Sequence, residues 1–222
     1  MIVAGLTYHL LHPNQRAWDS ELIDEAYRCW RRVWSDTLEE LDGVTRISSD
    51  QFTRQHEIGA LFLDKQCIGL STFRFVDLRV PCMRDDSYFE VWPETALKAL
   101  VRDGPHICIG SQLTVAPEWR RGASGLPVKD LLLGLAVQRF LESRTNTMTG
   151  LMRNNRNMNE LAYRLGAEPL MRGSTLHGVE VDLVAFRRHR QMLWADDPKL
   201  QRLQSGLWER ARKEMHNEEN VA

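Results

Sequence analysis

The sequence predicts an α/β domain in which a central, mixed and twisted β-sheet is flanked by helices. Apolar, β-branched stretches typical of strands alternate with stretches in which apolar residues recur every three or four positions, as they do in helices. The predicted order along the chain is α, β, β, β, α, β, α, β. The 222 residues are 43% apolar and 27% charged, a globular composition that supports one buried core.

The first half of the chain is predicted to hold one helix and one hairpin. Over 18–34, apolar residues recur at helical spacing behind an acidic first turn. Segments 58–63 and 67–76 are apolar and β-branched and are joined by three polar residues, which predicts an antiparallel hairpin. Segment 77–105 contains three prolines and has no clear period. It is too long for a plain connection, so we expect a functional excursion there.

The second half is predicted to repeat a strand followed by a helix. Segment 106–115 is a strand candidate, and 128–143 is a helix that is apolar over most of its circumference. A second unit follows, with a strand at 147–152, a helix at 154–165 that ends before a glycine, and an alternating strand at 175–186.

The end of the chain differs in character from the rest. Residues 187–222 carry many charges and only a weak helical stripe, which is typical of a surface helix with a frayed end. We therefore predict a domain over 1–186 and a charged helical extension over 187–222.

Composition excludes several classes of function. The 29 basic and 30 acidic side chains give a formal net charge of −1, so no bulk positive field favours nucleic acid as a partner. The four cysteines are spread singly and form no pair with zinc-ligand spacing, so we expect reduced thiols and no metal. We find no signal peptide and no integral membrane segment, and we expect a cytoplasmic protein.

The turn after strand 106–115 is a candidate phosphate site. A strand that ends in a glycine-rich turn and opens a helix directs backbone N–H groups and the positive end of the helix dipole at one point. The spacing of residues from Arg120 to Gly125 resembles the phosphate turn of GNAT acyltransferases and matches it at both ends. Ala123 stands where that pattern has Gly, and Pro127 removes one donor. A purely structural loop is therefore an equal alternative. The candidate phosphate-binding residues are Arg120, Arg121, Gly122, Ala123, Ser124 and Gly125.

The flanking residues resemble the acyl-homoserine-lactone (autoinducer) synthases, a branch of the GNAT fold. PHICIGSQLTV at 105–115 is similar to their Pro-His-Ile-Trp-Glu-Leu-Ser-Arg-Phe-Ala-Ile segment, and AYRCWRRVW at 26–34 is similar to their first helix. Further similarities lie at Asp50-Gln51-Phe52, from Pro81 to Phe89, and at 160–170. The resemblance covers about residues 20–190. It implies a GNAT-like acyl-CoA N-acyltransferase fold with no permanently bound cofactor.

Four positions depart from this family where it carries charge. Ile109 stands in place of the Glu two residues before the family's Ser, and Gln112 in place of the Arg after that Ser. Trp30 replaces an Arg of the first helix, and Thr53 replaces an Asp. Since the family handles S-adenosylmethionine with these residues, their loss argues against that substrate. The sequence resembles more closely the soil-derived N-acyl amino acid synthases, which accept a different amine.

Amide formation from a thioester requires a polarised carbonyl, a neutral amine and a proton acceptor. The resemblance places the backbone from Leu113 to Val115 beside the thioester. Ser111, His106 and Asp50 are the candidate catalytic residues for proton transfer. His106 is a candidate because imidazole commonly serves in general acid–base catalysis, but it begins its strand, and a structural role is the alternative.

The resemblance also implies substrate contacts. Tyr163 is a poor candidate for the general acid of many GNAT enzymes, because it is one residue late and Ala162 holds that position. An apolar slot for the acyl chain would be lined by Leu132, Trp92, Phe89, Leu151 and Met152. Ordinary core packing of these residues is the alternative. The predicted substrate-binding residues are Trp30, Trp34, Phe89, Gln112, Leu151, Met152 and Asn154.

The donor is expected to be an acyl thioester. Either the phosphopantetheine of an acyl carrier protein or acyl-CoA would supply the chain. The acidic carrier protein would dock on basic residues around the turn, where complementary charge raises the association rate. The alternative is that these basic side chains are scattered over the surface, solvated, and form no docking patch. The basic residues are Arg120, Arg121, Lys129, Arg153 and Arg156.

These observations predict an N-acyltransferase that moves a medium or long acyl chain onto a small amine such as an amino acid. Acyl-homoserine-lactone synthesis with rearranged acceptor contacts is one alternative. A non-catalytic acyl-thioester or carrier-protein binding module is another, because Ile109 and Ala162 stand at the two usual proton-transfer positions.

Overall fold

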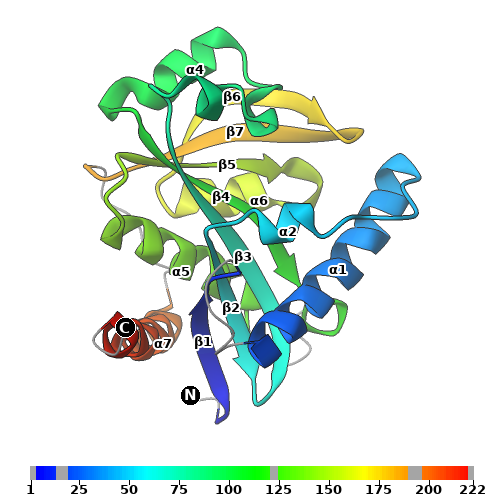
Figure 1. The fold of residues 1–222 in the computed structure, drawn as a ribbon, viewed down its shortest axis with the longest axis vertical. Helices are drawn as coiled ribbons and strands as arrows, with labels where there is room; N and C mark the ends of the chain where they lie inside the picture. The colour runs from blue at the N-terminus through cyan, green and yellow to red at the C-terminus, as the bar shows by residue number, and fades with distance from the viewer. Residues whose placement is uncertain (1–3, 14–19, 121–124, 190–196, 220–222) are drawn as a thin grey trace.

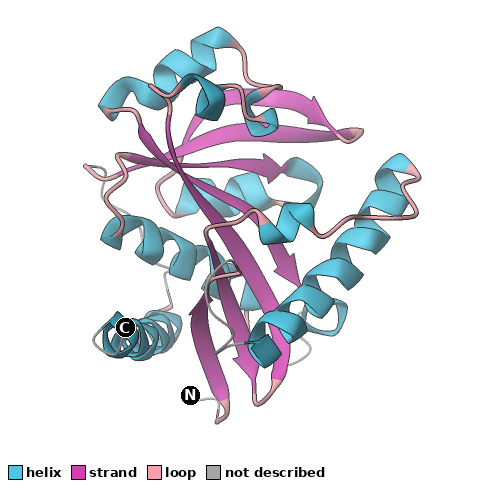
Figure 2. Ribbon diagram, in the orientation of Figure 1, coloured by secondary structure: helices cyan, strands magenta, loops and turns pink. Residues whose placement is uncertain are grey.

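The computed structural model describes residues 4–13, 20–120, 125–189 and 197–219, which form a seven-stranded β-sheet with helices on both faces (Figures 1 and 2). The strand order is β1-β2-β3-β4-β5-β7-β6, and every neighbouring pair is antiparallel except β4 and β5, which are parallel. The predicted α/β class with a mixed sheet is confirmed. The strands are β1 (Leu6–Leu11), β2 (Glu57–Leu63), β3 (Gln66–Asp77), β4 (His106–Val115), β5 (Thr147–Arg153), β6 (Glu168–Leu176) and β7 (Val179–Arg187).

Three longer helices cover the sheet. α1 (Ser20–Asp42) crosses one face, whereas α5 (Val128–Glu142) and α7 (Pro198–Glu219) lie on the other (Figure 1). None of the helices in the described part of the chain combines the length and apolarity that crossing a bilayer requires. The shorter helices are α2 (Asp50–Thr53), α3 (Pro81–Arg84), α4 (Glu94–Leu100) and α6 (Met158–Arg164), and the 3₁₀ turns are η2 (Ser87–Phe89), η3 (Val101–Asp103), η4 (Pro117–Trp119) and η5 (Asn154–Arg156).

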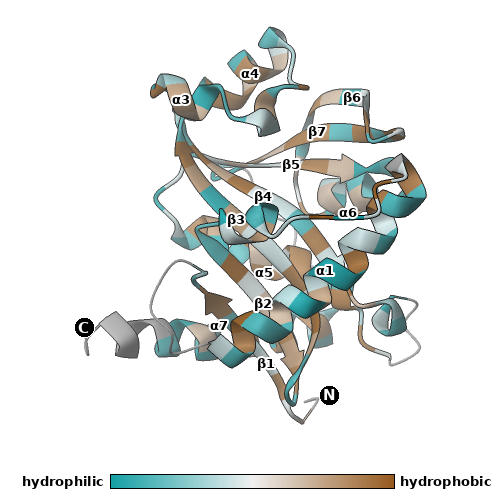
Figure 3. Cartoon of the chain, turned by 45° about the vertical axis from the view of Figure 1, so that its right-hand side comes forward, coloured by the Kyte–Doolittle hydropathy of each residue, from teal (hydrophilic) through white to brown (hydrophobic). Residues whose placement is uncertain are grey.

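Side-chain alternation along the strands divides the core into two layers. On β2, Ala60 and Phe62 pack toward α1, and Leu61 between them packs toward α5. α5 is apolar on nearly all sides because the sheet and α7 cover it together. Figure 3 shows this arrangement as brown central strands and a brown α5, with more teal on the outer surface of α1.

The sequence prediction does not include strand β1 or most of strand β6. β1 is a short edge strand that pairs with β2, and its alternation of buried and partly exposed residues extends only from Leu6 to Leu10. β6 pairs with β7 through two register shifts and is largely exposed, which weakens its apolar period. The predicted single strand at 175–186 is therefore wrong at its start. Residues 175 and 176 belong to β6, and β7 begins at Val179.

The helix at the end of the chain is packed more closely than predicted. Leu207 and Trp208 are buried in the same core cluster as α5, and Trp208 Nε1 donates to Glu142 Oε1 at 2.6 Å. Arg210 also donates to the Leu6 carbonyl of β1. The weak apolar stripe of this helix is thus its contact face with the core. The division into 1–186 and 187–222 stays a prediction.

The predicted excursion at 77–105 forms a cap of short helices. Phe89 and Trp92 pack on Ile107 and Ile109 of β4. The cap is attached to the sheet by Arg74 of β3, which makes a two-pronged ion pair with Asp86; the Nη2 to Oδ1 distance is 2.8 Å. Arg74 and Asp86 are largely buried, so this pair fixes the cap over the first half of β4.

β4 changes character at its middle. Its first residues pair on both sides, with β3 and with Thr147 to Thr149 of β5. The pairing with β5 stops at Ile109. On the β3 side, Gln112 and Leu113 together oppose Ser71, which is a β-bulge, and Gln112 has a left-handed φ of 49°. The sheet therefore opens between β4 and β5.

Candidate active site

A cavity lies where β4 and β5 separate. Its volume accessible to the centre of a water-sized sphere is about 100 Å³. The lining comes from both strands and from the helices on both faces of the sheet, so the cavity reaches through the opened seam. The lining residues are Trp34, Ser71, Gly110, Ser111, Gln112, Leu113, Leu133, Ala136, Met148, Thr149, Leu151, Met152, Arg153 and Met158.

The lining is apolar on the α5 side and polar near the bulge. Met148 and Met152 of β5 belong with Leu133 of α5 to the core layer behind the sheet. Flexible methionine side chains adapt to irregular apolar ligands. Arg153 is the single charged side chain among these lining residues. The arrangement suits an alkyl chain at one end and a polar reacting group at the other.

Indole and amide groups hold the bulge in place. Trp30 Nε1 donates to Gln112 Oε1, and Gln112 Nε2 donates to Gln51 Oε1 of α2 at 2.8 Å. Trp34 Nε1 donates to Thr114 Oγ1 at 3.0 Å, and Thr114 Oγ1 donates to the Gln112 carbonyl at 2.7 Å. α1, α2 and β4 are thereby joined by neutral groups at the positions where the resembled family carries two arginines.

Ser111 presents its hydroxyl at this bulge. Thr72 Oγ1 lies 2.9 Å from Ser111 Oγ and donates to the Ser111 carbonyl at 3.1 Å. Because the hydroxyl proton of Thr72 is used in the bond to the carbonyl, Ser111 Oγ donates to Thr72 Oγ1. The Ser111 oxygen keeps lone pairs that can accept a further hydrogen bond. The neighbouring Ser71 hydroxyl is buried, lines the cavity and has no hydrogen-bond partner among the described residues. Two hydroxyl groups are therefore positioned at the cavity where a polar group could bind.

The other two candidates for proton transfer lie outside the cavity lining. His106 is at the opposite end of β4, half-exposed, with Nε2 3.4 Å from Asp77 Oδ2. Asp50 begins α2 on the surface, where the Ser48 hydroxyl holds the pKa of its carboxyl below the usual value. Of the three candidates, the structure brings only Ser111 to the cavity. Among the described residues, no group of three His, Cys, Asp or Glu side chains is placed to hold a metal ion.

The predicted phosphate turn is described only at its ends. Arg121, Gly122, Ala123 and Ser124 lie outside the described residues. Gly125 has a left-handed φ of 70°. Of the predicted backbone contacts, Leu113 lines the cavity, whereas Val115 pairs with Gly69 of β3. The phosphate role of the turn stays a prediction.

Basic side chains gather beside this turn. Arg120 Nε donates to the Val115 carbonyl at 3.0 Å, and Lys129 Nζ lies 3.5 Å from the Arg156 carbonyl. Desolvation, followed by the positive charge of Arg156, lowers the pKa of the Arg120 guanidinium. The structure therefore brings Arg120, Lys129 and Arg156 into one region.

The predicted substrate contacts divide between the cavity and other parts of the fold. Trp34, Gln112, Leu151 and Met152 line the cavity. The others do not: Trp30 stands behind Gln112, Phe89 and Trp92 belong to the cap, Leu132 is in the core, and Asn154 donates to Asp182. Tyr163 donates to the same Asp182 carboxylate at 2.6 Å and is absent from the cavity lining.

The sequence argument misses several lining residues. Met148, Leu133 and Ala136 are not among the predicted site residues, and Arg153 was predicted only as part of a basic region. The apolar circumference of α5 is the one signal in the sequence for its part in the lining. Nothing local in the sequence indicates that β4 and β5 separate.

Comparisons with known proteins identify the fold. No family model matches the chain, and a search of the curated proteins finds no match. Among solved structures, the AHL synthase LasI superposes with a TM-score of 0.58 at 14% identity, covering 84% of this chain and 91% of that chain.

Two further structures show the same fold. FeeM, an N-acyl amino acid synthase from uncultured soil microbes, has a TM-score of 0.55 at 15% identity and covers 82% of this chain and 91% of its own. A mosquito arylalkylamine N-acetyltransferase-like protein has a TM-score of 0.59 at 14% identity and covers 82% and 99%. The predicted GNAT-like fold is confirmed, with AHL synthases and an N-acyl amino acid synthase among its structural neighbours.

Proposed function

We propose that this protein is an N-acyltransferase that moves a medium or long acyl chain from an acyl thioester to the amine of a small molecule such as an amino acid. The observation that carries the proposal is the cavity at the opened β4–β5 seam, which is apolar toward α5 and polar at the bulge. The neighbouring structures support it, since LasI is an AHL synthase and FeeM an N-acyl amino acid synthase. CoA and carrier-protein thioesters are cytoplasmic donors, so we propose a cytoplasmic reaction.

The bulge supplies the groups that the reaction needs. On the β5 side, the β4 backbone beyond Ile109 has no strand partner among the described residues, so its polar groups can bind the donor. A thioester carbonyl at Leu113 would be polarised by such backbone N–H groups. The amine nitrogen then attacks the carbonyl carbon, and the C–S bond breaks to release the thiolate.

Proton transfer sets a condition on the amine. The lining contains no carboxylate and no histidine among the described residues. Ser111 is a weak base, so the amine must arrive neutral and lose its second proton through Ser111 and water to solvent, while the thiolate takes a proton or leaves as an anion. The rate should therefore rise with pH along the titration of the amine itself.

The apolar end of the cavity binds the chain. Each methylene buried there contributes about 0.8 kcal/mol. Leu133, Ala136 and Met148 surround this end with no polar side-chain atom. A medium or long acyl group would bind more tightly there than an acetyl group.

The direct test is product analysis. Lipid extracts of cells that overexpress the chain are compared by mass spectrometry with extracts of cells carrying an empty vector. A new N-acyl amino acid supports the proposal. A homoserine lactone would identify the alternative synthase, and no new acylated product would favour a non-catalytic binding module.

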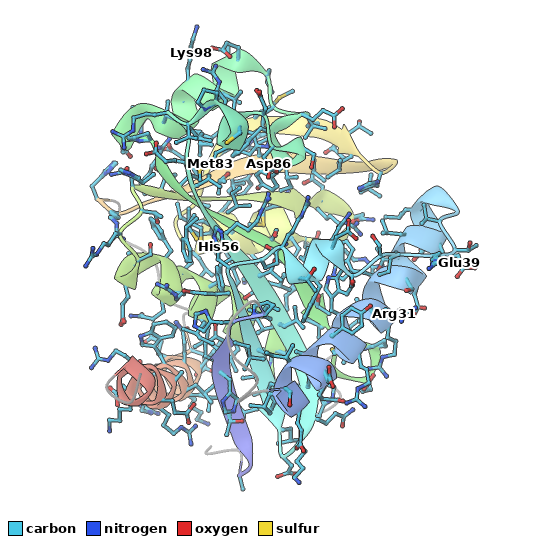
Figure 4. All side chains as sticks on the ribbon, viewed as in Figure 1. Arg31, Glu39, His56, Met83, Asp86 and Lys98 are labelled. Atoms are coloured by element: carbon cyan, nitrogen blue, oxygen red, sulfur yellow. The ribbon has the colours of Figure 1, made fainter. Side chains whose placement is uncertain are left out.

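The basic region around Arg120 is the proposed docking site for an acyl carrier protein. Arg120→Glu should raise the KM for an acyl carrier protein donor about tenfold at low salt and change the KM for the same acyl-CoA far less. Lys98→Glu is the matched control, because Lys98 is an exposed cation on α4 at one end of the molecule, away from Arg31 of α1 (Figure 4). Equal effects of Arg120→Glu on both donors would contradict carrier-protein docking.

A further inference from the structure

The Ser71 hydroxyl is a polar group without a partner inside the wall of the cavity. The side chain is 3% exposed and lines the cavity, and Ser71 Oγ forms no hydrogen bond among the described residues. Leaving a buried hydroxyl unpaired costs free energy, so native proteins contain few such groups. A hydroxyl that faces a cavity can form its hydrogen bond with a molecule that binds there.

The protons of the other hydroxyl groups in the lining are already used. Ser111 Oγ donates to Thr72 Oγ1, because Thr72 donates its own proton to the Ser111 carbonyl. Thr149 Oγ1 donates to the Val184 carbonyl at 2.7 Å. Ser71 is therefore the one hydroxyl group among the described lining residues whose proton is left for a ligand. Such a donor requires an acceptor atom on that ligand.

The register of β3 and β4 places this donor at the bulge. Ser71 lies opposite Gln112 and Leu113, the two residues of the bulge. Strand alternation directs Ser71 to the α5 side, since Phe73, two residues further along β3, packs in that core layer. Leu113 packs against the same layer and also lines the cavity. The Ser71 hydroxyl is therefore a neighbour of the backbone that would polarise the thioester carbonyl.

We propose that Ser71 Oγ donates a hydrogen bond to the carbonyl oxygen of the acyl thioester and stabilises the oxyanion that forms on this atom. The inference rests on the proposed function and adds to it a catalytic residue on β3. Every acyl thioester carries this acceptor oxygen, whatever its chain length. On the α5 side the lining is apolar, with Leu133, Ala136 and Met148, and a hydrogen bond to a developing charge is stronger in such surroundings.

The Ser71 hydroxyl keeps its proton throughout the reaction. As the amine lone pair forms the C–N bond, the carbonyl π electrons move to the oxygen, and the O–H group faces the negative charge. The nitrogen loses its proton through Ser111 and water. The C=O bond then re-forms and the C–S bond breaks, with its electron pair leaving on the thiolate. Ser71 is not a nucleophile, because the described lining residues include no histidine or carboxylate to accept its proton.

The first test is the rate of acyl transfer by Ser71→Ala, with dodecanoyl-CoA as donor and a mixture of amino acids as acceptor. We expect kcat to fall about 30-fold, because one oxyanion donor is lost and the backbone N–H groups remain. The KM for the donor should stay within about twofold, since the lost bond is strongest in the transition state. Ser71→Cys, which has a weaker donor, should give an intermediate kcat. Ser87→Ala, which removes an exposed hydroxyl of η2, is the matched control.

The dependence on chain length separates catalysis from packing. The carbonyl group is common to all donors, so Ser71→Ala should lose the same factor in kcat, within about threefold, for butanoyl-CoA and dodecanoyl-CoA. The urea midpoint of Ser71→Ala should equal or exceed that of wild type, because the variant removes an unpaired buried hydroxyl. An unchanged kcat, a loss that grows with chain length or a lower midpoint would each overturn the inference while leaving the N-acyltransferase intact.

A spectroscopic measurement tests the hydrogen bond without turnover. Infrared difference spectra are recorded for dodecanoyl-CoA, isotopically labelled at the carbonyl carbon and bound without an amine. A donated hydrogen bond lowers the C=O stretching frequency, so the band should move to higher frequency in Ser71→Ala and stay in place in Ser87→Ala. Equal frequencies in the two variants would contradict the bond from Ser71. Failure of the wild-type chain to acylate any amine would instead contradict the proposed function.

Discussion

The two halves of β4 serve different purposes within a single strand. From Ile107 to Ile109 the strand is paired on both sides, and the helical cap packs on it. From Gly110 to Leu113 it is separated from β5 and lines the cavity, and the bulge lies at Gln112 and Leu113. Ion-paired side chains hold the cap over the first half, whereas neutral indole, amide and hydroxyl groups hold the second.

This difference indicates how a continuous sheet supplies a binding site. The closed half satisfies its backbone polar groups internally, which a stable sheet requires. The open half leaves backbone polar groups toward the seam, where a substrate can pair with them. Stability and binding are therefore separable along one strand, and substitutions in the two halves should have different consequences.

The largest effect on function is expected from Gln112→Val. A β-branched residue is strongly disfavoured at a left-handed φ, and the variant also loses both amide hydrogen bonds. We expect the free energy of unfolding to fall by about 3 kcal/mol. Displacement of the bulge should lower kcat/KM for acyl transfer about 100-fold, as measured by release of free CoA thiol.

Gln112→Gly separates conformation from hydrogen bonding at the same position. Glycine adopts the left-handed φ without strain, so this variant should lose only the contributions of the amide group. Equal activities of the two variants would show that the backbone geometry of the bulge is unimportant for acyl transfer.

The next effect concerns the closed half. Asp86→Asn leaves the largely buried Arg74 without its ionic partner and should destabilise the fold by about 3 kcal/mol at pH 7. Glu94→Gln, which removes an exposed ion pair with Arg84, should leave the urea midpoint nearly unchanged. If Asp86→Asn also left the urea midpoint nearly unchanged, the stability of the cap would not depend on the ion pair between Arg74 and Asp86.

The same pair predicts a pH dependence of stability. The hydrogen bond from Arg74 holds the pKa of the Asp86 carboxyl below its usual value. The stabilisation that the ionised Asp86 carboxylate gives is therefore complete above the pKa of an unfolded Asp, about 3.9. It decreases as the pH falls toward the lower pKa of Asp86 in the folded protein. Urea unfolding is measured from pH 7 to pH 3. The difference in the free energy of unfolding between wild type and Asp86→Asn should narrow only below about pH 4.

A smaller effect is expected at the apolar end of the open half. Ala136 is buried on α5 and lines the cavity, so Ala136→Phe would occupy the space of about three methylenes. We expect kcat/KM for dodecanoyl-CoA to fall roughly 60-fold and that for butanoyl-CoA to change little. A uniform loss for all chain lengths would place the acyl chain elsewhere.

The smallest effect should come from His106→Ala. His106 is at the closed end of β4, where it contacts Asp77 and Arg79 on the surface. We expect kcat/KM to stay within about twofold, against a loss of about fivefold for Ser111→Ala at the cavity. A tenfold loss for His106→Ala would make the closed half part of the chemistry.

The comparison of predicted and observed residues shows where sequence reasoning succeeds. The helix over 18–34 and the hairpin at 58–63 and 67–76 were predictable, because apolar periodicity is local. The family resemblance led to Ser111, Gln112, Trp34, Leu151 and Met152, and all of them line the cavity. His106, Asp50 and Phe89 were chosen by the same resemblance and lie outside that lining, since residues near a site in sequence can point away from it.

The sequence by itself determined the α/β class, most of the elements and a resemblance that leads to acyl transfer. These properties depend on side-chain alternation and helical spacing, which are recorded along consecutive residues. Only the tertiary structure decided that β4 and β5 separate after Ile109, that Arg153 lies on Trp34, and that Arg74 pairs with Asp86. The pairing of β4 with β5 and the stacking of Arg153 on Trp34 join residues distant in sequence, so their free energy depends on the whole fold and leaves no local pattern to detect.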